Sequence, residues 1–167
     1  SAFRTALDRE RSTAIAMRVH SATSLAHSSA DAERFAVSWL KDYPQDSAFR
    51  MHLGVTAMEA KQFATAERHF KAVLELQPAN PIGLNNLAWA LLQQGKPGAL
   101  AYAEKANQLA PEQPAFMDTL AAALAEKGQL ANALDLQRNA LAKATEAAAP
   151  GYRLRLAKLL LKAGDQA

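Results

Sequence analysis

The sequence predicts an all-α fold in which antiparallel helix hairpins stack against one another. Half of the 167 residues are hydrophobic; alanine and leucine supply most of them, which favours helix over strand. Pro44, Pro78 and Pro111 stand 34 and 33 residues apart, the spacing of a two-helix repeat. A large residue is followed by a small one at corresponding places of successive units, at Leu53-Gly54, Leu87-Ala88, Leu120-Ala121 and Leu156-Ala157.

The second helix of each predicted hairpin carries alanine at one shared position, where a small side chain lets two helices approach closely. These alanines are Ala32, Ala66, Ala99 and Ala133. The segments between paired helices are short and suit a left-handed helix cap, and tight turns of this kind give antiparallel hairpins. They are Lys61-Gln62-Phe63, Gly95-Lys96-Pro97 and Gly128-Gln129-Leu130.

The predicted repeats follow one another along the chain. They are the end of a preceding second helix in residues 1–11, full hairpins in 12–46, 47–80, 81–113 and 114–149, and one first helix in 150–167. The hairpin 81–113 lacks one residue near its turn, and 114–149 keeps the pattern although Thr145 stands where the next proline would fall. Because the chain begins at Ser1 within a helical pattern, we expect a piece of a longer protein.

This pattern resembles the tetratricopeptide repeat (TPR), most closely within residues 47–80. The matching residues there are Leu53, Gly54, Phe63, Ala66, Phe70 and Pro78. Elsewhere the chain departs from the pattern: Arg50, Leu84 and Met117 replace the usual first-helix aromatic, and Ala103 stands where a large aromatic is usual. The resemblance implies a right-handed superhelical solenoid whose first helices line a concave groove that binds another protein or peptide.

A narrower resemblance rests on three segments in a fixed order. They are Asn85-Asn86-Leu87-Ala88-Trp89-Ala90, Ala101-Tyr102-Ala103-Glu104-Lys105-Ala106 and Met117-Asp118-Thr119-Leu120. With the closing Lys162-Ala163-Gly164-Asp165, they are similar to the C-terminal repeats of TPR lipoproteins of PEP-CTERM/exosortase systems, which accompany exopolysaccharide production. That likeness implies a periplasmic or outer-membrane-anchored protein, with the cytoplasm as the alternative, and polysaccharide-secretion machinery as a partner.

Charge and composition argue against several other classes of protein. The 19 basic and 16 acidic residues give a formal charge of +3 on a mixed surface, which does not suit a nucleic-acid backbone. No stretch reaches the roughly 18 apolar residues of a membrane helix. The chain has no cysteine and shows neither metal-ligand spacing nor a nucleophile turn or phosphate loop. We therefore expect no catalytic residue, no cofactor and no metal.

Candidate partner-binding residues are those at positions of the first helices that the repeat pattern predicts to be exposed. They are Arg18, Met51, His52, Asn85, Asn86, Trp89, Asp118, Thr119, Arg155 and Lys158. Trp89 is of a residue type that often dominates binding surfaces, although packing between helices is the alternative. Trp39, on a second helix, is expected in the core.

The leading functional hypothesis is a protein-interaction scaffold that binds a partner in the concave groove. One alternative is a structural spacer in an envelope assembly. Direct carbohydrate binding is less favoured, because the predicted groove contains a single tryptophan. A chaperone-type carboxylate clamp is not expected, because only Asn86 matches the residues that such a clamp needs.

Overall fold

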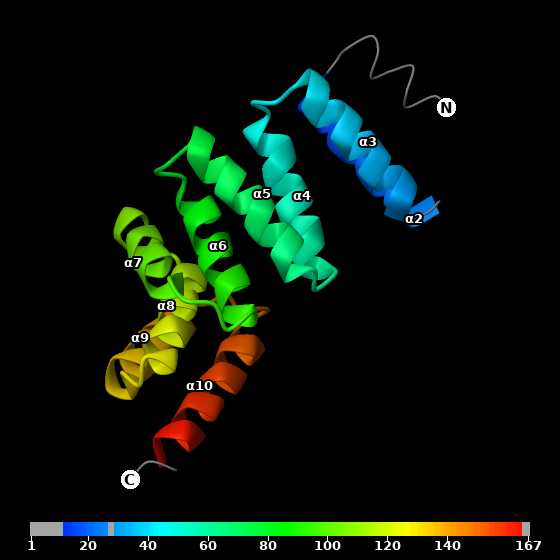
Figure 1. Ribbon diagram of the computed structural model, residues 1–167. Coiled ribbons are helices and arrows are strands. Elements are labelled where there is room, and N and C mark those ends of the chain that lie inside the picture. The colour runs from blue at the N-terminus through cyan, green and yellow to red at the C-terminus, as the bar shows by residue number, and fades with distance from the viewer. Residues whose placement is uncertain (1–11, 27–28, 165–167) are drawn as a thin grey trace. The chain divides into compact units, whose positions relative to one another are not determined.

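The computed structural model describes residues 12–26 and 29–164, which form helices joined by short turns, with no strand among them (Figure 1). The chain divides into two units, Ser1–Pro78 and Ala79–Ala167. The predicted end of a preceding helix in residues 1–11 lies outside the described residues. The repeat boundaries within the rest stay a prediction, whereas the all-α class is confirmed for the described residues.

The first unit contains two helix pairs. They are α2 (Thr13–Ala26) with α3 (Ser29–Asp42), and α4 (Ser47–Glu59) with α5 (Phe63–Leu76). α4 packs on both α5 and α2. Asp46 caps α4 by accepting a hydrogen bond from the Phe49 amide, and its other oxygen accepts bonds from the Trp39 indole and the Thr13 hydroxyl. One carboxylate therefore ties α2, α3 and α4 together.

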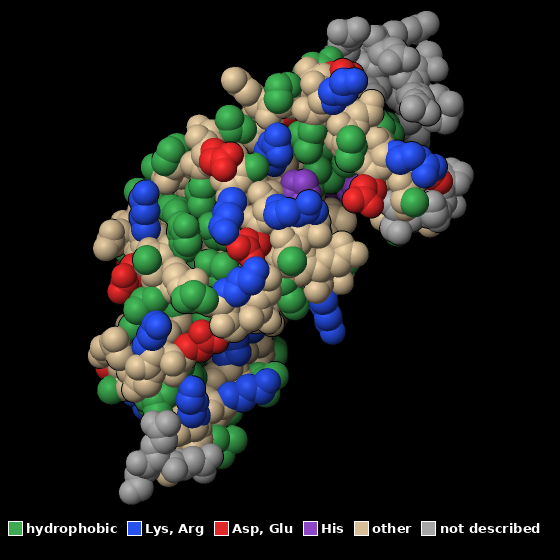
Figure 2. All heavy atoms as spheres, viewed as in Figure 1, with side chains coloured by type: hydrophobic (Ala, Val, Ile, Leu, Met, Phe, Trp, Pro, Cys, Tyr) green, Lys and Arg blue, Asp and Glu red, His purple; other side chains and the backbone are tan. Residues whose placement is uncertain are grey.

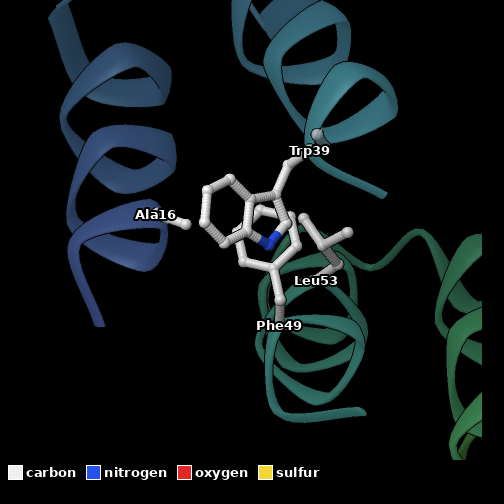
Figure 3. Close-up of a cluster of buried hydrophobic side chains, with 5 residues drawn as sticks. Ala16, Trp39, Phe49 and Leu53 are labelled. Atoms are coloured by element: carbon white, nitrogen blue, oxygen red, sulfur yellow. The ribbon is translucent and has the colours of Figure 1, made fainter. Parts of the chain in front are cut away.

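The core of the first unit is aromatic. Trp39 extends from α3 to Phe49 of α4, with Ala16 of α2 and Leu53 beside them (Figure 3). Trp39 is 5% exposed and Phe49 is fully buried, which confirms that Trp39 belongs to the core. The repeat pattern predicts an aromatic residue at the position of Arg50. In α4 the aromatic residue is Phe49, one position earlier.

The second unit contains two pairs and a further helix. They are α6 (Pro81–Gln93) with α7 (Ala99–Leu109), α8 (Pro114–Glu126) with α9 (Leu130–Lys143), and α10 (Ala149–Gly164). α7 packs on α8, α9 packs on α10, and α6 packs on α8. α7 is 11 residues long, against 14 for α9, in keeping with the residue missing from this repeat. The alanines Ala99, Ala103, Ala106, Ala133 and Ala140 lie buried in these helix pairs.

The turns between paired helices share one geometry. After α4, α6 and α8 the backbone takes a left-handed conformation at Lys61, Gly95 and Gly128, with φ of 58°, 60° and 76°. In each case two crossed amide-to-carbonyl hydrogen bonds close the helix end, for example from Gln62 to Ala57 and from Lys61 to Met58. This is a Schellman cap, and it fixes the sharp reversal of the chain.

Candidate functional site

A groove of about 290 Å³ lies within the second unit. Three first helices, α6, α8 and α10, supply most of its lining, and α9 adds one residue. The lining residues are Trp89, Leu92, Gln93, Asp118, Ala122, Ala125, Glu126, Gln137, Arg155, Lys158, Leu159 and Lys162. Four of the predicted residues, Trp89, Asp118, Arg155 and Lys158, are thus brought to one groove.

Trp89 is partly buried in the wall of this groove. Leu92, one turn along α6, and Leu159 of α10 supply further apolar surface in the same groove. The side chain therefore both packs and faces the groove, so that the two readings of Trp89 are compatible. An aromatic side chain held by neighbours loses little conformational entropy on binding, which is why such residues dominate many interfaces.

Asp118 is only 7% exposed, which corrects the expectation that this side chain is exposed. Its Oδ1 accepts hydrogen bonds from Gln137 Nε2 at 2.8 Å and from Arg155 Nε at 2.5 Å. Gln137 also donates to the Tyr152 carbonyl, and the Arg155 guanidinium lies 4.9 Å from the Tyr152 ring centroid. Burial, followed by the charge of Asp118, raises the pKa of Tyr152.

This buried network joins α8, α9 and α10, so Asp118 positions Arg155. A buried carboxylate is tolerated because both a cation and an amide satisfy it. Arg155 is thereby held in one orientation at the groove wall, whereas a free surface arginine would sample many rotamers.

Three further residues predicted on exposed positions have other environments. Asn85 is 8% exposed and Thr119 is 4% exposed, and the Thr119 hydroxyl donates to the Ala115 carbonyl of its own helix. Asn85 Nδ2 reaches Asn86 Oδ1 at 3.4 Å, and Asn85 Oδ1 is buried without a hydrogen-bond partner. The expectation of exposure is therefore wrong for Asn85 and Thr119, and Asn86 is partly buried.

The charged rim of the groove is mixed. Lys158 is exposed, Lys162 donates a hydrogen bond to the Ala125 carbonyl at 3.0 Å, and Glu126 adds a carboxylate. Lining residues that were not predicted from the sequence to bind a partner include Gln93, Ala122, Leu159 and Lys162. Each lies one helical turn after a selected residue, and the i to i+4 relation of a helix face was the signal that could have found them.

The remaining candidates lie in the first unit. Arg18 is exposed on α2, and Met51 and His52 are partly buried on α4. His52 Nε2 lies 3.0 Å from His20 Nδ1, so the two imidazoles share a hydrogen bond between α2 and α4. Burial, together with His52, lowers the pKa of His20 to about 4. Burial also lowers the pKa of His52, against the opposing charge of Glu59.

Metal-binding clusters and membrane-spanning helices are both absent from the described residues. No group of three or more histidine, cysteine, aspartate or glutamate side chains there is placed to hold a metal ion. None of the helices described is long and apolar enough to cross a membrane.

The repeats of this chain match a known protein family. The tetratricopeptide repeat model matches residues 26–81 and 53–114, which together cover more than half of the 167 residues. The chain belongs to the tetratricopeptide repeat family. Membership of this family gives the general function of a protein-interaction scaffold. TPR proteins are typically non-enzymatic.

Solved TPR structures share the fold. MamA residues 41 to the end from Desulfovibrio magneticus RS-1 aligns with a TM-score of 0.74 at 19% identity, over 92% of this chain and 86% of that one. YrrB, described as a TPR protein with an unusual peptide-binding site, gives 0.73 at 16% identity over 98% and 84%. The Sgt2 TPR domain from Aspergillus fumigatus gives 0.62 at 22% identity over 72% and 81%.

These likenesses confirm the predicted TPR-type solenoid fold. A comparison with curated proteins finds no match. The narrower resemblance to PEP-CTERM/exosortase lipoproteins thus stays a prediction from the sequence.

Proposed function

We propose that this TPR chain binds an extended segment of a partner protein in the groove of α6, α8 and α10, with one large apolar side chain of that segment packed on Trp89. The observation that carries the proposal is the convergence of three first helices on one groove that joins an aromatic, two leucines and a positioned arginine. Such a combination of apolar anchor and fixed polar groups is typical of specific binding sites.

The size and rim of the groove define the partner. A volume of about 290 Å³ is near the lower end of ligand pockets, roughly 300–1,000 Å³, so it accepts one or two side chains of a segment. Lys158, Lys162 and Glu126 all line the groove, which favours a segment with groups of both charges over one of a single charge.

Selection of peptides from a random 12-mer display library on the purified chain, followed by anisotropy titration of the winning peptide, tests this site. Trp89→Ala should weaken binding by about 10-fold or more, since anchor residues contribute about 2 kcal/mol or more. The matched control is Leu154→Ala, because Leu154 lies on α10, one of the helices that line the groove, but is 58% exposed and outside the groove. Equal loss in both variants, or no loss in Trp89→Ala, would overturn the proposal.

The biological setting that we propose is bacterial exopolysaccharide production and PEP-CTERM protein sorting, at the periplasmic side of the envelope. The support is the likeness of the segments around Asn85 to Thr119. Deleting the gene in its host should reduce exopolysaccharide and missort PEP-CTERM proteins, and fractionation should find the protein in the envelope. Normal polysaccharide with cytoplasmic protein would contradict this setting and leave the groove proposal intact.

The same experiments distinguish the alternative function, a structural spacer that binds no ligand. A spacer selects no peptide from the library. In the host it tolerates Trp89→Ala but not removal of the whole chain. A scaffold with a working groove is sensitive to both changes.

A further inference from the structure

A second cleft, of about 450 Å³, lies within the first unit, between the second helices α3 and α5. It is lined by His20, Ser24, Ala32, Glu33, Ala36, Val37, Leu40, Arg50, Leu53, Thr56, Ala57, Ala60, Gln62, Thr65, Arg68 and His69. Figure 2 shows histidine surface bordered by basic and hydrophobic side chains on this face. None of the partner-binding residues predicted from the sequence is among them.

Trp39 occupies the position of α3 that corresponds to Val73, Ala106 and Ala140 in the later second helices. In the second unit, α7 and α9 pack closely on α8 and α10, whereas α3 reaches α4 through aromatic rings, with 5.9 Å between the Trp39 and Phe49 centroids. The Trp39 indole extends from α3 toward Phe49 and Leu53 of α4, with Ala16 of α2 beside it (Figure 3).

The α3 wall of the cleft is apolar. Its apolar lining residues are Ala32, Ala36, Val37 and Leu40, and Glu33 is the one charged residue that α3 adds. Val37 is 65% exposed, so it offers apolar surface that a ligand could cover. Each Å² of such surface removed from water contributes about 25 cal/mol.

The opposite wall is basic. Arg50 of α4 and Arg68 of α5 line it together with the His69 imidazole. Burial, followed by the charges of Arg68, Arg50 and His20, lowers the pKa of His69 to about 4. Burial is the larger cause of this depression, and the neighbouring charges of Arg68 and Arg50 add to it. Glu33 is the one carboxylate among the lining residues, and it lies on α3.

We propose that this cleft binds an acidic segment of a partner protein, with leucine-type side chains against Val37 and Leu40 and carboxylates against Arg50 and Arg68. Arg68 can bind a carboxylate through paired hydrogen bonds. Arg50, whose Nε and Nη2 donate to the Pro44 carbonyl, contributes its positive charge, and the basic wall attracts an acidic chain before contact. Neutral His69 and Thr65 can donate or accept further hydrogen bonds from the same segment.

The length of the cleft favours a polypeptide over a compact small molecule. Its lining runs along α4 from Arg50 to Ala60, a distance of about 15 Å at 1.5 Å per helical residue. An amphipathic helix or extended segment matches an open trough with one apolar and one charged wall. This site is separate from the groove of the second unit, so each proposal can fail without the other.

The probe is a synthetic amidated peptide of about 12 residues, with leucines every third or fourth position and glutamates on its opposite face. We expect titration into the 15N-labelled 167-residue chain to shift amide signals of α3 and α5 and to raise the pKa of His69, because carboxylates favour the imidazolium. Arg68→Glu and Val37→Ser, both at exposed sites, should each weaken binding by about 10-fold. A peptide with lysine in place of glutamate should not bind.

Two control variants separate the cleft from its surroundings. The first is Arg34→Glu. Arg34 lies on α3 outside the cleft lining, and its exposed ion pair with Asp31 contributes little to stability. The affinity for the acidic peptide should therefore stay within about twofold of that of the unmodified chain. Trp89→Ala should also leave this affinity unchanged. The proposal is overturned if the acidic peptide fails to bind at about 1 mM, if the lysine peptide binds equally, or if signals shift only in the second unit. Binding of decanoate without the peptide would likewise overturn it, in favour of a small-molecule site.

Discussion

Lys61 holds a left-handed backbone conformation, with φ of 58°, at a position where the two later caps have Gly95 and Gly128. For a residue with a side chain, this conformation costs about 1–2 kcal/mol. The cost is accepted because the Schellman hydrogen bonds of this turn form nonetheless. The first unit therefore carries a strained cap that the second unit lacks.

Replacing Lys61 with glycine should stabilise the first unit. The strain is relieved, while the greater freedom of glycine in the unfolded chain offsets part of the gain, so we expect about 0.5–1 kcal/mol. Urea unfolding measures the change. The matched control is Lys127→Gly one residue before Gly128, where φ is −84°; that variant should be destabilised, and a gain there would contradict the explanation.

Helix packing in the first unit depends on Gly54 of α4. A methyl group at this position would meet the ring of Phe70, with Cδ1 at 2.8 Å and Cζ at 2.9 Å. Phe70 is fully buried on α5, so its ring has little room to move.

Gly54→Ala should therefore destabilise the chain by about 1–3 kcal/mol, although alanine is the better helix former. Gly151→Ala on α10 is the control, because its nearest contact is the Arg155 side chain at 3.6 Å, and it should be neutral or stabilising. Thermal unfolding of both variants gives the signs. Adding Phe70→Leu to Gly54→Ala should recover part of the loss, and no recovery would rule out the ring contact as the cause.

The hairpins could be predicted from the sequence because their signals are local. Proline spacing, the alternation of large and small residues and the left-handed caps each depend on residues within one or two turns. The groove could be predicted only in part. Trp89, Arg155 and Lys158 follow from equivalent positions on first helices, but the burial of Asp118 depends on Gln137, a residue of the second helix α9.

The basic cleft of the first unit could not be predicted from repeat positions. Its lining comes from α3 and α5 as well as from α2 and α4, whereas the repeat pattern directs attention to the exposed positions of first helices. Its shape depends on the distances between these helices, and a pattern of helical periods carries no information on such distances.

The molecule as a whole carries its histidines unevenly. All four lie before Pro78, and the second unit has none. His20 and His69 have pKa values lowered to about 4. A histidine with a lowered pKa binds fewer protons in the folded state than in the unfolded state. The free energy of unfolding therefore decreases as the pH is lowered.

Acid should therefore weaken the first unit selectively, between about pH 6.5 and pH 4. Each unit has one tryptophan, Trp39 or Trp89, so the variants Trp89→Phe and Trp39→Phe report each unit separately by fluorescence. We expect the Trp39 transition to move to lower urea as pH falls, with the Trp89 transition nearly fixed. Equal movement of both, or a His20→Gln His69→Gln variant with unchanged pH dependence, would contradict the assignment.

The volume of Trp39 also bears on how an array of similar modules diversifies. Exchanging one residue at the seam between a hairpin and its successor should change the distance between the helices there, while the turn and caps of that hairpin stay as they are. A repeat protein can thus acquire a new receptor surface without a new loop or insertion. Placing tryptophan at Ala106 or Ala140 would be the corresponding design step for opening a second such gap.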